Sequence, residues 1–294
     1  MTEGPTRRRH QDPQRRDRSR PPAPEPLPRP VVDNHCHLDI ADGPGGADGD
    51  WLATEEALEA AAAVGVTRVV QIGCDLPGAR WAVDAAGRHD ALVAGVALHP
   101  NEAPLLAGQG RLDAALDEIE ALASSSERVR AIGETGLDYY RDHASREDQA
   151  RAFAAQIEIA RDTGKPLVIH TREADDDTIA TLTREAAGVT VILHCFSMPQ
   201  RFDECREHGW WLSYAGNVTY PRNAALAATA LRVPLDRMLV ETDAPYLTPQ
   251  AVRKERNQPA FVVHTARFVA ERRGVAYEDL EAAVERTAAG LFGW

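Results

Sequence analysis

The chain has 294 residues, of which 44% are hydrophobic and 6% aromatic, and its formal net charge is −12. This length allows one large α/β domain or two ordinary ones. The acidic balance argues against a protein that coats nucleic acid non-specifically. No apolar run approaches the roughly 20 residues of a membrane helix, and the start, M-T-E-G-P-T-R-R-R-H, lacks the apolar core of a secretory signal. The four cysteines form no C-x-x-C pair, which favours reduced thiols. We therefore expect a cytoplasmic protein with no membrane partner.

Residues 1–30 differ in composition from the rest of the chain. They hold eight Arg against four acidic residues, eight of the nineteen Pro, and almost no large apolar side chains. Such a segment buries too little surface to fold, so we expect a disordered, Arg/Pro-rich tail at 1–30 and one folded domain at 31–294. The tail either contacts phosphates or only solvates the start of the domain.

Apolar runs typical of β-strands then alternate with helical patterns. Strands are expected at 31–32, 67–72, 91–98, 129–132, 166–169, 190–193, 210–213 and 238–240. Helices are expected at 54–63, 79–87, 112–123, 146–162, 173–186, 200–208 and 223–231, with two more at 259–273 and 277–289. Eight alternating units predict an α/β fold of the (β/α)8 TIM-barrel type. An open, doubly wound sheet stays the alternative, because periodicity counts strands but does not show closure.

The first strand ends in the stretch D-N-H-C-H-L-D, in which His35 and His37 are separated by one residue. Residues i and i+2 of a strand point to the same side, so the two imidazoles can close on one cation. Imidazole nitrogen suits zinc, manganese and related divalent metals. An H-x-H pair is weak on its own and needs further ligands elsewhere in the chain.

Polar side chains follow several other strands in the same way. Glu134 follows the fourth strand, His170 the fifth, His194 the sixth and Asp243 the eighth, while His99 ends the third. A single such residue is more often a hydrogen-bonded structural group or a helix cap. In a barrel, however, these strand ends converge on the face where active sites are built. Five of the ten histidines lie at strand ends, which favours a metal site.

The combined donor set is larger than one tetrahedral metal requires, so two divalent metals sharing Glu134 are expected. Two such ions polarise a phosphoryl or carbonyl oxygen and activate a water. Asp243 is the natural general base for that water, and hydrolysis without a covalent intermediate is the expected reaction. The expected metal ligands are His35, His37, Glu134, His170, His194 and Asp243.

The chain resembles the TatD-type metal-dependent deoxyribonucleases, a branch of the amidohydrolase-like (β/α)8 hydrolases. The resemblance runs in order over roughly residues 31–260, and its motifs are specific only jointly. They are D-N-H-C-H-L-D, L-H-P-N-E-A, I-G-E-T-G-L-D-Y-Y-R, Q-A-R-A-F-A-A-Q-I-E-I-A, K-P-L-V-I-H-T-R-E-A, I-L-H-C-F-S, L-S-Y-A-G-N-V-T and V-E-T-D-A-P-Y-L-T-P.

The resemblance implies that His35 and His37 bind one metal together with Glu134 and Asp243. It implies that Glu134, His170 and His194 hold the second, that His99 lines the site, and that Arg172 and Glu241 lie close to it. Magnesium, manganese or zinc are the implied ions, and DNA, single-stranded or cut from its 3′ end, is the implied substrate.

Departures from the family pattern, Asn101 and Gln258 among them, put substrate preference in doubt. The family commonly has a second His where this chain has Asn101, and the R-N-E-P of the family reads R-N-Q-P here, with Gln258 in place of a carboxylate.

Three further features have two interpretations each. Tyr139 either stacks a base or packs its loop, and Arg172 either clamps a phosphate or pairs with a nearby carboxylate. The basic run Arg253, Lys254 and Arg256 either contacts phosphates or is a solvated loop. We count His99, Arg172, Tyr139 and Arg256 as candidate substrate contacts.

A metal-dependent nuclease is therefore the first hypothesis, acting as a monomer with Asp243 and Glu134 as catalytic groups. The alternative is an amidohydrolase-type hydrolase of small esters, amides or lactones, or an aminoacyl-tRNA deacylase, using the same metals. Related lactonase and phosphotriesterase sites bridge their metals with a carboxylated Lys, and no Lys lies near Glu134. A metal-stabilised binding protein is a third possibility, and Asp243 argues against it.

Overall fold

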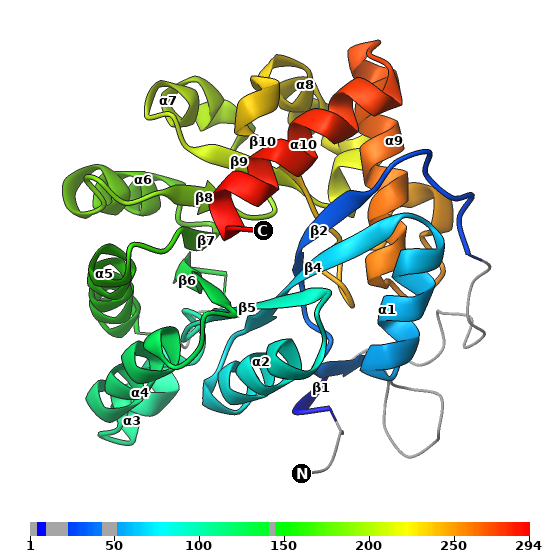
Figure 1. Ribbon diagram of the computed structural model, residues 1–294. Helices are drawn as coiled ribbons and strands as arrows, with labels where there is room; N and C mark the ends of the chain where they lie inside the picture. Colours follow the sequence, from blue (N-terminus) through cyan, green and yellow to red (C-terminus); the bar gives the residue numbers. More distant parts are fainter. Residues whose placement is uncertain (1–4, 10–22, 43–51, 141–144) are drawn as a thin grey trace. The chain divides into compact units, whose positions relative to one another are not determined.

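The structure is a computed structural model that describes residues 5–9, 23–42, 52–140 and 145–294 (Figure 1). The chain divides into two compact units. Unit 1 comprises residues 1–71, 213–290 and 294, and unit 2 comprises residues 72–212 and 291–293. Among the described residues, no helix is both long enough and apolar enough to span a membrane.

Eight strands form one sheet in the order β10-β9-β8-β7-β6-β5-β4-β2. Pairs such as β2–β4 and β6–β7 are parallel. The first and last strands of this order meet within unit 1, where Cys36 bridges Ala244 and Asn34 Nδ2 donates to Val240 O at 2.5 Å. The fold is therefore the expected (β/α)8 barrel and not an open sheet. The strands are β2 Val31–Cys36, β4 Val66–Gly73, β5 Leu92–Val96, β6 Val129–Asp138, β7 Leu167–Arg172, β8 Val191–Leu193, β9 Trp211–Tyr214 and β10 Met238–Val240.

Unit 1 adds helices and a small second sheet to its strands. Strand β1 (Arg7–Arg9) pairs in parallel with β3 (Ile40–Asp42). The helices are α1 Thr54–Ala63, α8 Ala224–Arg232, α9 Val262–Arg273 and α10 Tyr277–Phe292. Helix α9 ends at Gly274, whose φ of 65° is the left-handed conformation that glycine adopts most readily.

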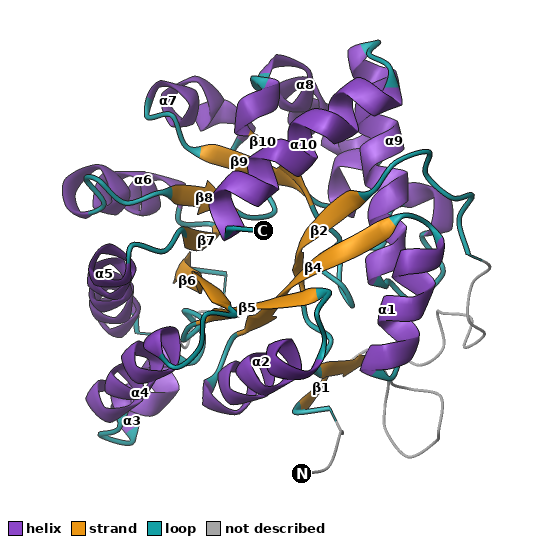
Figure 2. Ribbon diagram, viewed as in Figure 1, coloured by secondary structure: helices purple, strands orange, loops and turns teal. Residues whose placement is uncertain are grey.

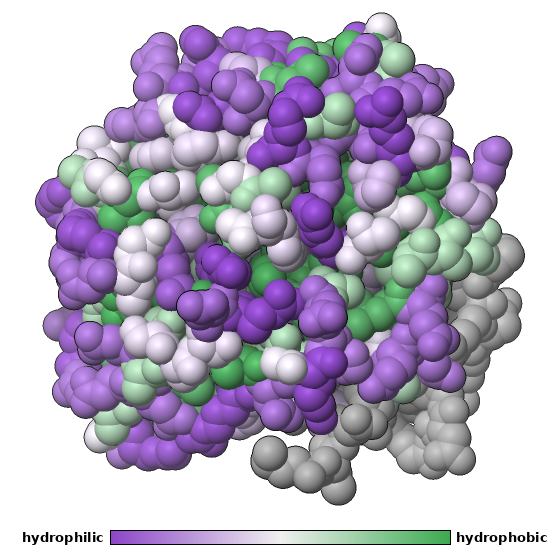
Figure 3. Space-filling model, in the orientation of Figure 1, coloured by the Kyte–Doolittle hydropathy of each residue, from purple (hydrophilic) through white to green (hydrophobic). Residues whose placement is uncertain are grey.

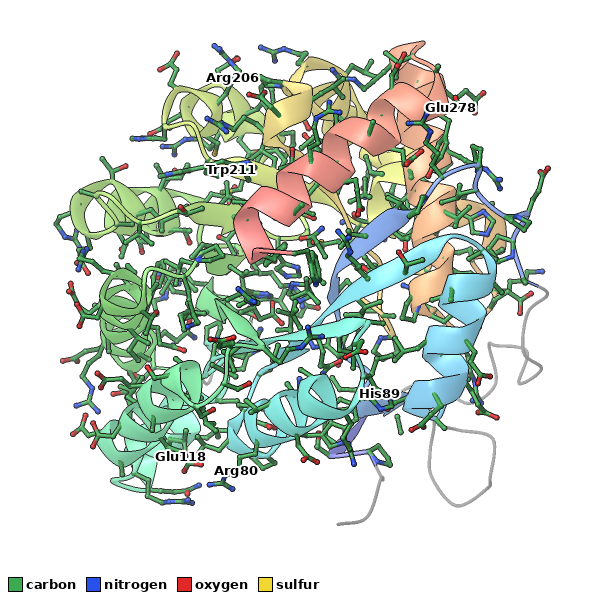
Figure 4. The ribbon with its side chains drawn as sticks, viewed as in Figure 1. Arg80, His89, Glu118, Arg206, Trp211 and Glu278 are labelled. Carbon is green, nitrogen blue, oxygen red and sulfur yellow. The ribbon has the colours of Figure 1, made fainter. Side chains whose placement is uncertain are left out.

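In unit 2, helices alternate with strands β5 to β8 and pack against them (Figure 2). The helices are α2 Leu76–Arg88, α3 Ala103–Gly108, α4 Leu112–Ser124, α5 Arg146–Thr163, α6 Asp175–Glu185 and α7 Phe202–Glu207. Ser145 caps α5 by accepting a hydrogen bond from Asp148 N at 3.2 Å. On the surface, Arg80 of α2 and Glu118 of α4 form a two-bond ion pair (Figure 4).

Two buried glutamines of α5 fix the strands beside them. Gln156 accepts from Leu98 N at 2.7 Å and donates to Leu98 O at 3.1 Å, and Gln149 makes the same pair of bonds to the backbone of Asp138, both at 2.9 Å. The two residues are seven positions apart, which places them two turns apart on one helix face. Each satisfies backbone groups that a buried strand end would otherwise leave unpaired.

All eight expected strands are confirmed, and an expected helix precedes or follows each. Two strands end later than expected. Strand β6 continues to Asp138 and β7 to Arg172, so Glu134 and His170 lie within strands and not just after them. Helix α3 and the β1–β3 sheet were not expected from the sequence. The hydrophilic side chains that dominate the face shown in Figure 3 leave only small hydrophobic patches.

The expected tail at 1–30 lies partly outside the described residues, which omit 1–4 and 10–22. The described remainder contacts unit 1. Leu27 is buried and its N donates to Val64 O at 3.0 Å, while Thr6 Oγ1 donates to Asp39 Oδ2 at 2.6 Å. Arg267 of α9 also donates to Pro26 O at 3.1 Å.

Candidate functional site

Unit 1 brings three of the expected ligands together. His35 and His37 point to the same side of β2, and their Nε2 atoms are 3.3 Å apart. Asp243 Oδ1 lies 3.3 Å from His37 Nε2 and 3.9 Å from His35 Nε2. All three residues are buried. We call these residues the first cluster.

The first cluster is positioned mainly by its backbone. Asp243 N donates to His35 O at 2.9 Å, and Asp243 O accepts from Tyr246 N at 2.7 Å. The φ of Asp243 is 54°, a conformation that non-glycine residues adopt rarely but Asp tolerates. Just before it, the buried carboxylate of Asp33 accepts from both Thr242 N (2.8 Å) and Thr242 Oγ1 (2.5 Å). Burial, partly offset by these bonds, raises the pKa of Asp33 to about 8.

Two neighbours of the first cluster point elsewhere. Cys36 lies between the two histidines in sequence, and its Sγ is directed to Gln71 Oε1, 4.0 Å away. Burial raises the pKa of the Cys36 thiol. Glu241 is buried and accepts from Ser213 Oγ at 2.5 Å.

Unit 2 brings the other expected ligands together around Glu134. Glu134 Oε2 lies 2.9 Å from His194 Nε2 and 3.1 Å from His170 Nδ1. The ring of His99 meets that of His170 edge to face, with centroids 4.4 Å apart. We call Glu134, His170, His194 and His99 the second cluster.

Asp138 is a member of this region that sequence reasoning missed. Its Oδ2 lies 3.5 Å from His170 Nε2, the ring nitrogen that faces away from Glu134, and accepts from Asn101 Nδ2 at 3.1 Å. Asn101 N in turn donates to His99 Nδ1 at 3.0 Å. Asn101, which departs from the family pattern, is thus a structural link between His99 and Asp138.

The charges of the second cluster reinforce one another. Burial alone raises the pKa of Glu134, but the imidazole of His194 and hydrogen bonds from His170 and His194 hold it well below its usual value. Burial lowers the pKa of His170, yet Asp138 and Glu134, one at each ring nitrogen, raise it above its ordinary value. The pKa of Asp138 is lowered, because the contacts with His170 and Asn101 outweigh burial.

Cys74 was also missed as a neighbour of Glu134. Its Sγ lies 3.2 Å from Glu134 Oε1, and the side chain is buried. No pattern in the sequence pointed to it, because the residue follows an ordinary buried strand. None of the four cysteines forms a disulfide among the described residues.

The expected substrate contacts separate into two groups. Tyr139 OH donates to Asp177 Oδ2 at 2.8 Å, and Arg146 lies over its ring, 3.9 Å from the centroid. Its neighbour Tyr140 is 54% exposed, with the guanidinium of Arg172 stacked on its ring at 3.5 Å. Arg172 is exposed and lines a surface hollow with Ser197. Arg256 belongs to unit 1 and is half-buried in the segment after β10.

Both clusters have the donor chemistry of a metal site. In each, imidazole nitrogens and a carboxylate oxygen lie within 4.8 Å of one another, as in His35–His37–Asp243 and His99–Glu134–His170. Nitrogen and oxygen donors in such sets suit zinc, manganese and similar divalent ions. The residues present therefore fit the ions that the sequence implies.

Comparison with known proteins gives a consistent result. The family of TatD-related DNases matches residues 32–293. A metal-dependent hydrolase, TatD of Mycobacterium tuberculosis, is 42% identical over 82% of this chain and 89% of its own length. A protein of Klebsiella pneumoniae named 3′-5′ ssDNA/RNA exonuclease TatD is 31% identical over 81% of this chain and 91% of its own length.

Solved structures share the fold. The TatD homologue YjjV of Escherichia coli superposes with a TM-score of 0.79 at 23% identity, covering 90% of this chain and 98% of that one. A TatD-family hydrolase of Entamoeba histolytica has a TM-score of 0.78 at 19% identity, with the same coverage.

Proposed function

The chain belongs to the family of TatD-related DNases and is a metal-dependent hydrolase, and we propose that it cleaves the phosphodiester bonds of single-stranded DNA from the 3′ end. The observation that carries this proposal is the pair of donor clusters, the first buried and the second partly buried, each with a carboxylate. The activity named for the Klebsiella relative supports the choice of substrate and polarity. Action as a cytoplasmic monomer stays a prediction from the sequence.

We propose that the first cluster holds one divalent ion through His35, His37 and Asp243. The second holds another through Glu134, His170 and His194, with His99 beside them. When bound, such ions polarise a phosphoryl oxygen and lower the pKa of a coordinated water. The use of Glu134 by both ions, which the resemblance implies, stays a prediction.

Asp243 is the proposed general base. Its backbone is fixed on both sides, by His35 O and by Tyr246 N, so its carboxylate is held in place before substrate arrives. A positioned carboxylate that accepts the proton of the attacking water contributes typically about 10²–10⁴-fold to the rate. In the second cluster, His170 is held between Glu134 and Asp138, which leaves its ring little freedom to turn.

Substrate contacts are proposed for Arg172 and Tyr140 in unit 2. An exposed tyrosine with an arginine stacked on its ring offers one base a planar surface and one phosphate a guanidinium. Tyr139 already uses its hydroxyl on Asp177, so its own role as a substrate contact stays a prediction. Arg256 is proposed as a phosphate contact in unit 1.

Degradation of 3′-labelled and 5′-labelled single-stranded DNA tests the function directly. The purified chain is assayed with magnesium, manganese, zinc or EDTA, beside Asp243→Asn. The control is Asp236→Asn, which removes the same charge from an exposed position of unit 1. We expect metal-dependent cleavage, release of mononucleotides from the 3′ end, and loss of activity in Asp243→Asn only.

A chain that retains metal but cleaves no DNA with any ion would contradict the proposal. Small esters, lactones and aminoacyl-tRNA are then the substrates to test with the same preparations.

A further inference from the structure

Two loops of unit 1 join into one rigid structure beyond β9 and β10. Tyr220 OH donates to Thr248 O at 2.9 Å, and Gln250 N donates to Thr219 Oγ1 at 2.7 Å. A Cβ at Gly216 would overlap the carbonyl oxygen of Leu247, so only glycine permits this approach. The segment after β9, residues 216–223, and the segment after β10, residues 245–257, are therefore joined by hydrogen bonds and by one close backbone approach.

The joined loops concentrate positive charge in an acidic chain. Together the two segments contain Arg222, Arg253, Lys254 and Arg256 against a single acidic residue, Glu255, whereas the chain as a whole carries −12. Arg222, Arg253 and Lys254 are exposed, and Glu255 Oε2 is buried. We call these four basic residues the basic clip.

Tyr220 organises the clip. Its ring is 5% exposed, and the guanidinium of Arg253 lies over it at 4.8 Å from the centroid, with that of Arg222 at 5.5 Å. Cation–π contacts at this range hold an arginine side chain without using its N–H donors. One arginine from each loop is thus pre-oriented, with its donors available to a ligand.

The clip is anchored to the segment that carries Asp243. Asn257, one residue after Arg256, donates through Nδ2 to Thr242 O at 2.8 Å and also to Tyr246 O. Tyr246 N binds Asp243 O, and the Tyr246 ring lies 6.0 Å from that of His37. The clip is therefore tied by hydrogen bonds to the backbone on which the first cluster is built.

We propose that the basic clip binds the phosphates of a single nucleic-acid strand next to the nucleotide being cleaved. This inference rests on the proposed function and adds that the substrate is a strand several nucleotides long, and not a small ester. The four charges of the clip attract phosphates locally, although the net charge of the chain is negative. A strand held in this way is bound through a few of its phosphates.

The test separates strand binding from hydrolysis. Affinity for a fluorescent oligothymidylate is measured by anisotropy in EDTA over a series of salt concentrations, for the full chain and for Arg222→Ala/Arg253→Ala. The control, Arg206→Ala/Arg232→Ala, removes the same charge from exposed residues near the ends of α7 and α8; Figure 4 labels Arg206. An oligouridylate of equal length serves as the RNA arm. Hydrolysis of bis(p-nitrophenyl) phosphate with added metal reports on the clusters alone.

We expect the clip variant to bind the oligothymidylate about tenfold or more weakly, because charge-assisted hydrogen bonds to phosphate are removed. The slope of log K against log salt is negative, and its magnitude decreases by about 0.7 for each phosphate that the variant no longer neutralises, so by about 1.4 for two. Hydrolysis of the small diester and the thermal transition stay unchanged, and the control variant behaves as the parent chain.

Equal affinity and slope in the parent and the clip variant would overturn the proposal, as would a parent chain that binds neither oligonucleotide. A parent that binds through the clip yet cleaves no strand with any metal leaves the clip standing and overturns the proposed nuclease function instead.

Discussion

The two candidate metal clusters are built on different principles. In the first, His35, His37 and Asp243 are fixed by backbone hydrogen bonds between β2 and the segment after β10, and the carboxylate is 3.3 Å or more from either imidazole. In the second, Glu134 lies within 3.1 Å of two imidazoles, and Asp138 and Asn101 continue the polar contacts outward.

The difference shows two ways to prepare donors for a cation. The first cluster is held mainly by main-chain hydrogen bonds between two segments. The second relies on a chain of charged side chains, in which each group stabilises the charge or orientation of the next. We therefore expect side-chain substitutions to affect metal binding more in the second cluster than in the first.

The largest effect is expected for Glu134→Gln. Losing this charge removes the charged partner of His170 and His194 and weakens the binding of a metal ion. We expect the transition state to lose several kcal/mol of stabilisation, so kcat/KM falls at least about a thousandfold. Metal content, measured by mass spectrometry after gel filtration, falls with it. Glu120→Gln, an exposed change on α4, should alter neither. Full metal content and activity in Glu134→Gln would show that the second cluster is not a metal site.

Asp138→Asn should weaken one cluster and spare the other. Because the substitution keeps the shape but removes the charge facing His170 Nε2, we expect a roughly 10–100-fold loss of affinity for the ion of the second cluster. Asn101→Ala, which removes only the support of Asp138, should have a smaller effect in the same direction. Titration against a metal-binding dye measures both sites; an equal loss at both would contradict the separation of the clusters.

Two matched substitutions compare the stability of the units. Thr242→Val removes a hydrogen bond from the buried Asp33 in unit 1, and Gln156→Leu removes both partners of the Leu98 backbone in unit 2. A buried group left unpaired costs about 1–3 kcal/mol, so Gln156→Leu, which leaves more groups unpaired, should cost more. Urea unfolding measures each value. Changes within error of zero would mean that water replaces the missing partners.

The smallest effect concerns pH and Glu281 of α10. Burial raises the pKa of this carboxyl in the folded chain, so its ionisation destabilises the fold as pH rises through the folded pKa. Glu281→Gln should therefore be more stable than the parent at neutral pH, by roughly 0.5–1 kcal/mol, and equal to it in acid below the ordinary carboxyl pKa. Melting temperatures across pH measure the difference, and the exposed Glu271→Gln on α9 is the control. A parent that is the more stable at neutral pH would refute the sign.

The fold and most of the clusters were accessible from the sequence because each signal is local. Eight apolar runs define eight strands, and His35, His170, His194 and Asp243 each stand where an apolar run stops. A barrel then brings such positions to the same end of the strands. Periodicity and strand-end chemistry were sufficient for this part.

What was missed depends on contacts that periodicity does not encode. Asp138 looked like a loop residue because Gly133 and Gly136 interrupt the apolar pattern, yet β6 runs through both to Asp138. A Cβ at Gly136 would overlap the carbonyl oxygen of His170, so this glycine marks a close strand pair and not a turn. Cys74 contacts Glu134, 60 positions away, and Asn101 contacts Asp138, 37 positions away.

The hydrogen bonds that join β2 to β10 and to the segment after it also determine when the first cluster can form during synthesis. Asp33 binds Thr242 across 209 positions, and Asn34 binds Val240 across 206. At about 5–20 residues per second, a ribosome needs roughly ten to forty seconds to make the residues between them. Throughout that interval His35 and His37 are present without the aspartate that completes their cluster, so the nascent chain cannot assemble the first cluster before its last strand emerges.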